Sequence, residues 1–532
     1  MKYSRFFYTF LLFLALIFPL NHGLSSDEQV IEDHQFESDV GTAVFSLLKT
    51  LPEIWKLKKE ARKLSETLPD YDGEVEVPDS DIIYEWLTEL CSTPHRRPGT
   101  PEGIRAEGWV ANKFREIGLQ DIKLDPVSIR VWEAQQWSLT IEGQNIPSFF
   151  VLNTEFTPKS GISAPMVYVG VGDQKDFKKT DVKGKIVVAE VPFPILPTGL
   201  LLRGIGSSYV VSNPDGSFKL SSWQYLNFVR PNFVGQSTLE TAPSTDVYWN
   251  AVKNGAAGIC LILKNQPSRY NTHYGPYDGI MKPMPGLWIG KYEGEKLRKY
   301  AKQEKEATLK LTGSNKPGEM KNVWGILPGM SDDVILVTSH HDSPFKGASE
   351  DGAGTVQVLA QAWAWSRVPK EKRDKTMVFV VDGGHFYGSK GAFQFAREHK
   401  DIMDRTRILL TLEHLAAKDV EEKDGEYEPN GDPALTVMFT SHDPTVVAAV
   451  MKAFDKKPPK RTASISSTFF GEAPASDAAG YVLEAGVPVI SWIGCPYYLL
   501  DSGDTLDKIE KSELAPIAET VTEIVKVFMA ID

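Results

Sequence analysis

Residues 334–354 read VILVTSHHDSPFKGASEDGAG, an apolar run that ends in two histidines and an aspartate. A glycine-rich turn follows, and it carries the acidic pair Glu350 and Asp351. Short apolar runs closed by polar residues are typical of buried strands. Imidazole and carboxylate groups are also among the ligands that zinc prefers in proteins. The stretch therefore predicts a strand with a metal or catalytic site at its carboxyl end.

From Asn322 onward, apolar strand-like runs alternate with helical patterns. Such alternation predicts an α/β fold, in which a mostly parallel, twisted sheet carries helices on both faces. The predicted strands are 334–339, 376–381, 407–412 and 487–492, and the predicted helices are 353–366, 388–398, 444–454 and 511–530.

Further polar groups follow these strands. They are Asp382, His385 and Tyr387 after the second strand, Glu413 and His414 after the third, and Tyr498 after the fourth. In open α/β sheets, sites form beyond the carboxyl ends of the strands, so we expect these groups to gather near His340. Adjacent residues of a regular strand point to opposite faces. His340 and His341 should therefore not face the same pocket, and the same limit applies to Glu413 and His414 unless the strand ends irregularly.

The opening stretch resembles the metal site of the secreted zinc aminopeptidases, in the metallopeptidase family that includes the glutamate carboxypeptidases. The family pattern is His-x-Asp-Ser followed by Gly-Ala-x-Asp-(Asn/Asp)-x-x-Gly, and the resemblance covers about residues 79–530. It implies that His340 binds metal and that Asp342 orients its ring. It also implies that Glu350, or Asp351 beside it, replaces the bridging aspartate, and that Glu413 is a further ligand.

Two later positions depart from the family pattern. Where the family has Glu-Glu-x-Gly-Leu-x-Gly-Ser, with the general base first and a zinc ligand second, one alignment gives His385 and Phe386, and another gives Asp382 and Gly383. The slot of the last ligand, a histidine in the family, holds Leu500. The resemblance therefore implies zero or one zinc ion. We expect His385 to act as the base, because an imidazole is a competent base near neutral pH.

Residues 160–315 have a different sequence pattern, with short β-rich runs that end in glycines. This order resembles the protease-associated domain, which implies an inserted, β-rich substrate wall without chemistry of its own. The predicted organisation is a signal peptide over 1–25, a helical leader over 26–78, a peptidase-like domain over 79–159 and 316–532, and the insert over 160–315. Arg96 and Arg97 are expected to be solvated.

The amino terminus indicates where the protein is located, and the composition indicates which classes of partner it can bind. Lys2 and Arg5 precede the apolar run 6–20, a pattern typical of a secretory signal peptide. We therefore expect export to the periplasm or the outside, without stable membrane insertion after cleavage. A net charge of −12 argues against nucleic acid as a partner. The expected partner is a small-molecule or peptide substrate.

Three functions remain open at this level. The first is an aminopeptidase-like hydrolase with a rewired site of at most one metal ion, in which His341 and His414 help to orient the ligands. The second is a metal-free lyase or cyclase that uses His385 with Tyr387 or Tyr498. The third is a non-catalytic binding module on a peptidase fold. Metal content is the measurement that separates them best.

Overall fold

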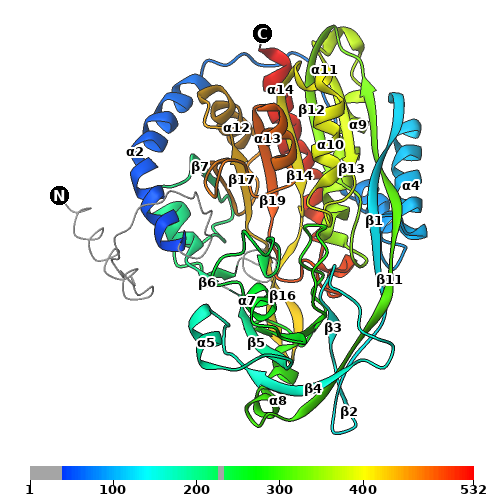
Figure 1. Ribbon diagram of the computed structural model, residues 1–532. Coiled ribbons are helices and arrows are strands. Elements are labelled where there is room, and N and C mark those ends of the chain that lie inside the picture. Colours follow the sequence, from blue (N-terminus) through cyan, green and yellow to red (C-terminus); the bar gives the residue numbers. More distant parts are fainter. Residues whose placement is uncertain (1–38, 194, 226–232, 532) are drawn as a thin grey trace, which may run out of the picture. The chain divides into compact units, whose positions relative to one another are not determined.

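A computed structural model describes residues 39–193, 195–225 and 233–531 (Figure 1). The chain divides into two compact units, residues 1–50 and residues 51–532, and the following description concerns the second. The predicted signal peptide and residues 26–38 of the predicted leader lie outside the described residues. The rest of the leader holds helix α2 (Asp39–Ser65). Within the described ranges, no helix is both long and apolar enough to cross a bilayer.

The centre of the second unit is a twisted sheet of mostly parallel strands. β12 (Ser331–His340) lies between β13 (Lys375–Asp382) and β14 (Thr406–Glu413) and is parallel to both. β14 is also parallel to β19 (Val489–Gly494). The carboxyl ends of these four strands therefore meet at one edge of the sheet. The sheet continues from β19 through β17 (Thr436–Thr440) and β18 (Thr462–Ser466) to β7 (Val210–Ser212).

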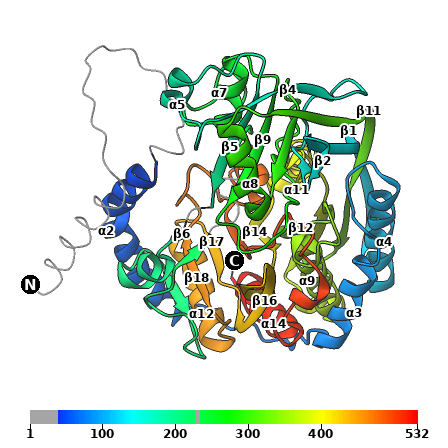
Figure 2. The ribbon, with the colours of Figure 1, turned by 90° about the horizontal axis from the view of Figure 1, so that it is seen from below.

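Helices cover both faces of this sheet, which confirms the predicted fold class (Figures 1 and 2). α9 (Gly354–Ser366) packs on β12, β13 and β14, and α14 (Leu514–Ala530) packs on α9. A separate apolar core joins side chains of β12 and β13 to the helices on the other face. Those helices are α10 (Lys390–Glu398), α11 (Lys400–Met403) and α13 (Ala478–Ala485). On the first face, α3 (Ser80–Leu90) and α12 (Pro444–Lys456) pack on α14, and α4 (Pro101–Ile117) contacts α9.

Each of the eight strands and helices predicted from Asn322 onward corresponds to an observed element with bounds within three residues. The sequence analysis missed β17 and β18, because their serine and threonine content hides their burial. Thr436 bonds to Thr462 through their hydroxyl groups at 2.8 Å, and Thr440 bonds to Ser464 in the same way at 2.8 Å. Paired hydroxyls satisfy one another across the strands, so these polar residues can be buried.

Four strands of the predicted insert pair side by side and share a core with the strands next to them (Figure 2). β4 (Ile162–Tyr168), β5 (Ile186–Pro192), β9 (Gly258–Lys264) and β10 (Gly286–Ile289) form consecutive parallel pairs. Two 22-residue strands, β1 (Gln120–Ile141) and β11 (Glu306–Leu327), pair along most of their length. β11 pairs with β4 near its start and with β13 near its end. The predicted boundary between residues 315 and 316 thus falls inside a continuous strand.

Other helices and strands also belong to this unit. They are the helices α5 (Gln174–Lys179), α7 (Val247–Lys253) and α8 (Lys291–Lys302), and the strands β2 (Gln144–Ile146), β3 (Phe149–Phe150), β6 (Ile195–Leu196), β8 (Gln224–Tyr225), β15 (Lys418–Lys423) and β16 (Glu426–Pro433).

A buried carboxyl between α4 and β11 makes stability depend on pH. Glu107 is 3% exposed and accepts a hydrogen bond from the backbone N–H of Lys321 at 3.0 Å. Burial raises the pKa of Glu107 from 4.5 to about 7. Folding therefore favours the protonated form, and the contribution of this group to the free energy of unfolding falls as the pH rises through that interval.

Glu107→Gln should remove this dependence, because the amide stays neutral and can still accept the hydrogen bond from Lys321. We expect the variant to gain about 2–3 kcal/mol relative to the wild type between about pH 5 and pH 8. Urea denaturation of both proteins at a series of pH values measures the difference. Parallel pH profiles for the two proteins would contradict the assignment.

Candidate metal centre

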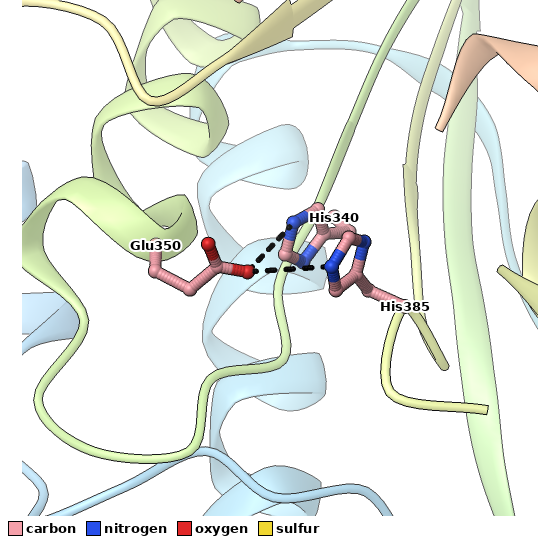
Figure 3. Close-up of side chains that lie close together, drawn as sticks. All are labelled: His340, Glu350 and His385. Atoms are coloured by element: carbon pink, nitrogen blue, oxygen red, sulfur yellow. Dashed lines mark ion pairs between the residues drawn. The ribbon is translucent and has the colours of Figure 1, made fainter. Parts of the chain in front are cut away.

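Three buried side chains meet at the carboxyl edge of the sheet (Figure 3). His340 ends β12, Glu350 lies in the turn before α9, and His385 follows β13. The Nε2 atoms of both histidines lie 3.6 Å from Glu350 Oε1. The two imidazole rings stack, with centroids 4.5 Å apart and planes 8° apart. One ligand atom from each residue lies within 4.8 Å of the others.

This group fits a metal ion by its unpaired atoms. Within the described part of the chain, His340 Nε2 and Glu350 Oε1 are buried without a hydrogen-bond partner, and so is Asp477 Oδ2. Buried polar atoms left without partners cost free energy, so their clustering at one point needs an explanation. Two imidazole nitrogens and one carboxylate oxygen form a donor set that zinc accepts. A divalent ion would satisfy these atoms.

Asp477, at the start of α13, is a member of the cluster that the sequence analysis did not select. Its Oδ1 accepts hydrogen bonds from His385 Nδ1 at 2.8 Å and from the Ser389 hydroxyl at 2.5 Å. Its Oδ2 lies 3.8 Å from His340 Nε2. The available signal was the Ser476–Asp477 pair, which also fits the family pattern.

The charges of the cluster balance one another through strong pKa shifts. Burial alone would lower the pKa of His340, but the carboxylates around it, led by Asp477, raise it well above its usual value. Burial opposes ionisation of Glu350, yet His414, His385 and His340 lower its pKa to about 2. The imidazoles and the Glu350 carboxylate thus favour each other's charged forms.

Glu413 and His414 both face this region, although they are neighbours in sequence. His414 has φ of 54°, in the left-handed region, so the alternation of a regular strand ends there. His414 Nε2 lies 2.9 Å from Glu350 Oε2, and its Nδ1 donates to the carbonyl of Gly494 at 3.0 Å. Despite burial, Glu350 raises the pKa of His414 to about 10. Glu413 accepts hydrogen bonds from the backbone N–H of Asp477 at 3.2 and 3.4 Å.

His341 points away from the cluster, so the prediction that it orients the ligands is wrong. Its Nε2 donates to the carbonyl of Lys321 on β11 at 2.8 Å. The physical reason is the alternation of strand residues, which sends His340 and His341 to opposite sides. Asp342 does lie beside His340, with Oδ1 3.4 Å from His340 Nδ1.

The other predicted ligands and acids have partners of their own. Asp351 accepts hydrogen bonds from the Ser339 hydroxyl at 2.6 Å and from the backbone N–H of His414 at 2.8 Å. Asp382 lies opposite His340 in the strand register and accepts from the Tyr481 hydroxyl at 2.8 Å. Asp351 thus ties strand ends together, while Asp382 keeps one buried oxygen, Oδ1, without a partner among the described residues.

The structure does not bring the two predicted catalytic tyrosines to the cluster. The hydroxyl group of Tyr498 donates to the carbonyls of Lys418 at 2.9 Å and Lys508 at 3.2 Å. The Tyr387 ring packs with the small core that includes Val127 and Ile129 on β1. The Tyr498 hydroxyl is thus bonded to the backbone and the Tyr387 ring is packed against β1, so a position shortly after a strand did not by itself identify a catalytic tyrosine.

Arg96 is fully buried, so the prediction that it is solvated is wrong. Its guanidinium group donates to the carbonyls of His341 at 2.8 Å, Gly347 at 2.9 Å and Glu350 at 3.2 Å, and to that of Lys346. On the other side of the turn, Asp504 accepts hydrogen bonds from the backbone N–H groups of Ser349 and Glu350, each at 2.8 Å. These two residues fix the backbone of Glu350.

Comparison with known proteins agrees with the motifs. Residues 322–525 match the model of peptidase family M28. Aminopeptidase YwaD of Bacillus subtilis is 26% identical over 321 residues, which are 59% of this chain and 56% of that protein. Human carboxypeptidase Q is 23% identical over 332 residues, 60% of this chain and 61% of that protein. The chain thus spans little more than half the length of these relatives.

Solved structures show the same fold over more of the chain. The zinc aminopeptidase BSAP of Bacillus subtilis has a TM-score of 0.61 at 21% identity, with 85% of this chain and 95% of that one covered. A peptidase M28 precursor from Shewanella amazonensis SB2B has a TM-score of 0.62 at 19% identity, with 90% and 98% covered. The fold implied by the resemblance is confirmed, and the match to the peptidase M28 model covers residues 322–525.

Arg96→Met should destabilise the protein severely, because the carbonyls that Arg96 binds would remain buried without donors. Each such loss costs about 1–3 kcal/mol, so a total loss above about 3 kcal/mol is expected. Denaturant unfolding measures it. The control is Arg115→Met, at an exposed position of α4, where a change within about 0.5 kcal/mol is expected. Equal unfolding midpoints for the two variants would contradict the role of Arg96.

Proposed function

Because residues 322–525 match peptidase family M28, we propose that this chain is an exported hydrolase of small peptides or amides with a single bound metal ion. His340, Glu350 and His385 would hold the ion, and zinc is the first candidate. The observation that carries the proposal is the buried, unpaired pair His340 Nε2 and Glu350 Oε1, with His385 Nε2 also 3.6 Å from that oxygen. Export rests on the signal-peptide pattern of residues 1–25.

The surrounding residues would orient the ligands. The bond from His385 Nδ1 to Asp477 leaves Nε2 of the same ring directed toward Glu350. Carboxylates that bind the second nitrogen of a ligand histidine fix its tautomer and raise its basicity. Arg96 and Asp504 hold the backbone from which the Glu350 side chain projects. When bound, a divalent ion supplies Lewis acidity and lowers the pKa of a water ligand.

Proton transfer needs a residue other than a ligand. If His385 binds metal through Nε2, that nitrogen cannot also accept a proton. The role of general base, which the sequence analysis gave to His385, then falls to another residue. Asp382 is the best alternative, because its Oδ1 is buried without a partner within the described ranges and it ends the strand next to His340. This choice corresponds to the second alignment of the family pattern, in which Asp382 takes the place of the base.

The metal-free lyase or cyclase is the weaker candidate. As predicted from sequence it uses Tyr387 or Tyr498 with His385, and the hydroxyl of Tyr498 is bonded to backbone carbonyls. A binding module remains the alternative if metal binds without turnover.

The purified protein should hold at most one zinc per chain after dialysis, by elemental analysis. His340→Ala and Glu350→Gln should each lose that ion, because each removes one of three ligands. His442→Ala is the matched control, since His442 is an exposed imidazole that bonds to the Tyr209 hydroxyl, and it should retain the metal. Two tightly bound equivalents in the wild type would contradict the single-metal site.

Turnover should depend on the bound ion and on the carboxylate of Asp382. On a panel of aminoacyl amides and dipeptides, a chelator should abolish activity and zinc should restore it. Asp382→Asn should lower the turnover number by about two to four orders of magnitude, the usual span for a general base, while metal content stays unchanged. Activity that survives chelation would favour the lyase or cyclase. Metal binding without turnover on any substrate would favour the binding module.

A further inference from the structure

A segment of the insert, residues 270–282, lies against the candidate metal centre, and it is called the site loop here. The backbone N–H of Gly388 donates to the carbonyl of Tyr277 at 2.7 Å. The backbone N–H of Tyr274 donates to the carbonyl of Leu500 at 2.9 Å. These bonds attach the site loop to both segments that follow the central strands β13 and β19.

Apolar packing joins the same segments. The Tyr274 ring contacts the Phe386 ring edge to face, with centroids 5.1 Å apart. Phe386, Leu499 and Leu500 are buried members of the core that otherwise consists of the insert and its neighbouring strands. The resembled family would have metal ligands at the positions of Phe386 and Leu500. In this chain, the side chains there anchor the site loop.

The site loop also contributes a ring to the cluster itself. Tyr277 stacks on the His385 ring with centroids 4.9 Å apart and planes 25° apart. His340 stacks on the same ring with a centroid distance of 4.5 Å. The rings of Tyr277 and His340 thus both pack nearly parallel to the His385 ring at stacking distance.

This arrangement limits how the His385 ring can turn. Asp477 lies 2.8 Å from its Nδ1, and the two stacked rings restrict its tilt. The remaining nitrogen, Nε2, is thereby directed at Glu350. Without the Tyr277 ring, one face of the imidazole would lose its cover and the ring could swing toward the insert.

We propose that Tyr277 is a positioning residue of the metal site, through which the insert fixes the orientation of the ligand His385. The inference rests on the proposed metal site, but it assigns to the insert a part in building that site. The phenyl ring is what matters, so Tyr277→Phe should behave like the wild type and Tyr277→Ala should not. Loss of a residue that orients a metal ligand typically costs 10–100-fold in metal affinity.

The test measures affinity for Zn²⁺ by chelator competition, and the visible absorption of the Co²⁺-loaded protein as a report on coordination. Tyr277→Ala should weaken Zn²⁺ binding by about 10–100-fold and change the Co²⁺ spectrum, and Tyr277→Phe should restore both. The matched control is Tyr270→Ala. Tyr270 is also an aromatic residue of the site loop, but it stacks on Tyr427 instead of His385, so its loss should leave both readouts unchanged.

A third measurement does not need the metal. In the metal-free protein, carbethoxylation of His385, followed by mass spectrometry, should be faster in Tyr277→Ala than in the wild type or in Tyr277→Phe. If the wild type binds metal, and Tyr277→Ala changes neither the Zn²⁺ affinity nor the rate of carbethoxylation, the role of Tyr277 is overturned and the proposed metal site stands. Equal losses of affinity in Tyr270→Ala and Tyr277→Ala would also overturn this role, because they would indicate general loosening of the site loop. A wild type that binds no Zn²⁺ or Co²⁺ would overturn the metal site and this inference together.

Discussion

The burial of the Glu350 carboxylate is the constraint on which the rest of the site depends. A buried charge is tolerated only when it is paired and hydrogen-bonded. Here three imidazoles, from three different strand ends, face its two oxygens at 2.9 to 3.6 Å. Arg96 and Asp504 hold the backbone on either side of it. The backbone of the turn at residues 348–353 is therefore held by Arg96 and Asp504, and not by the imidazoles that face the Glu350 carboxylate.

The second organising feature is that the insert is continuous with the peptidase-like domain. The strand β11 crosses the predicted boundary without a linker and pairs with β4 on one side of it and with β13 on the other. The core of the insert also includes Phe386 and Leu500. A domain joined in this way shares its rigidity with its neighbour, unlike domains that meet through a small polar interface. The site loop is thus a wall of the cluster with a defined position.

Much of the fold could be predicted from sequence, because long apolar runs and helical periods report burial directly. His340, Glu350 and His385 could be selected because each follows a strand of the parallel sheet. Asp477 escaped selection because it lies at the start of a helix, where an aspartate usually serves as a cap. Arg96 escaped because no local pattern reveals a guanidinium buried among carbonyls from a turn some 250 residues further along the chain. Tyr277 depends on how the insert meets the sheet, which one sequence does not report.

The apolar character of Phe386 and Leu500 has an evolutionary consequence. Phe386→Glu or Leu500→His, made singly, would place a polar group in the core of the insert, 1% and 3% exposed respectively, where it would be desolvated without a partner. Phe386→Glu would also remove the ring on which Tyr274 packs. Metal ligands at these two positions would therefore each destabilise the protein unless the insert changed with them. The sequence of the insert and the sequence around the cluster thus constrain one another.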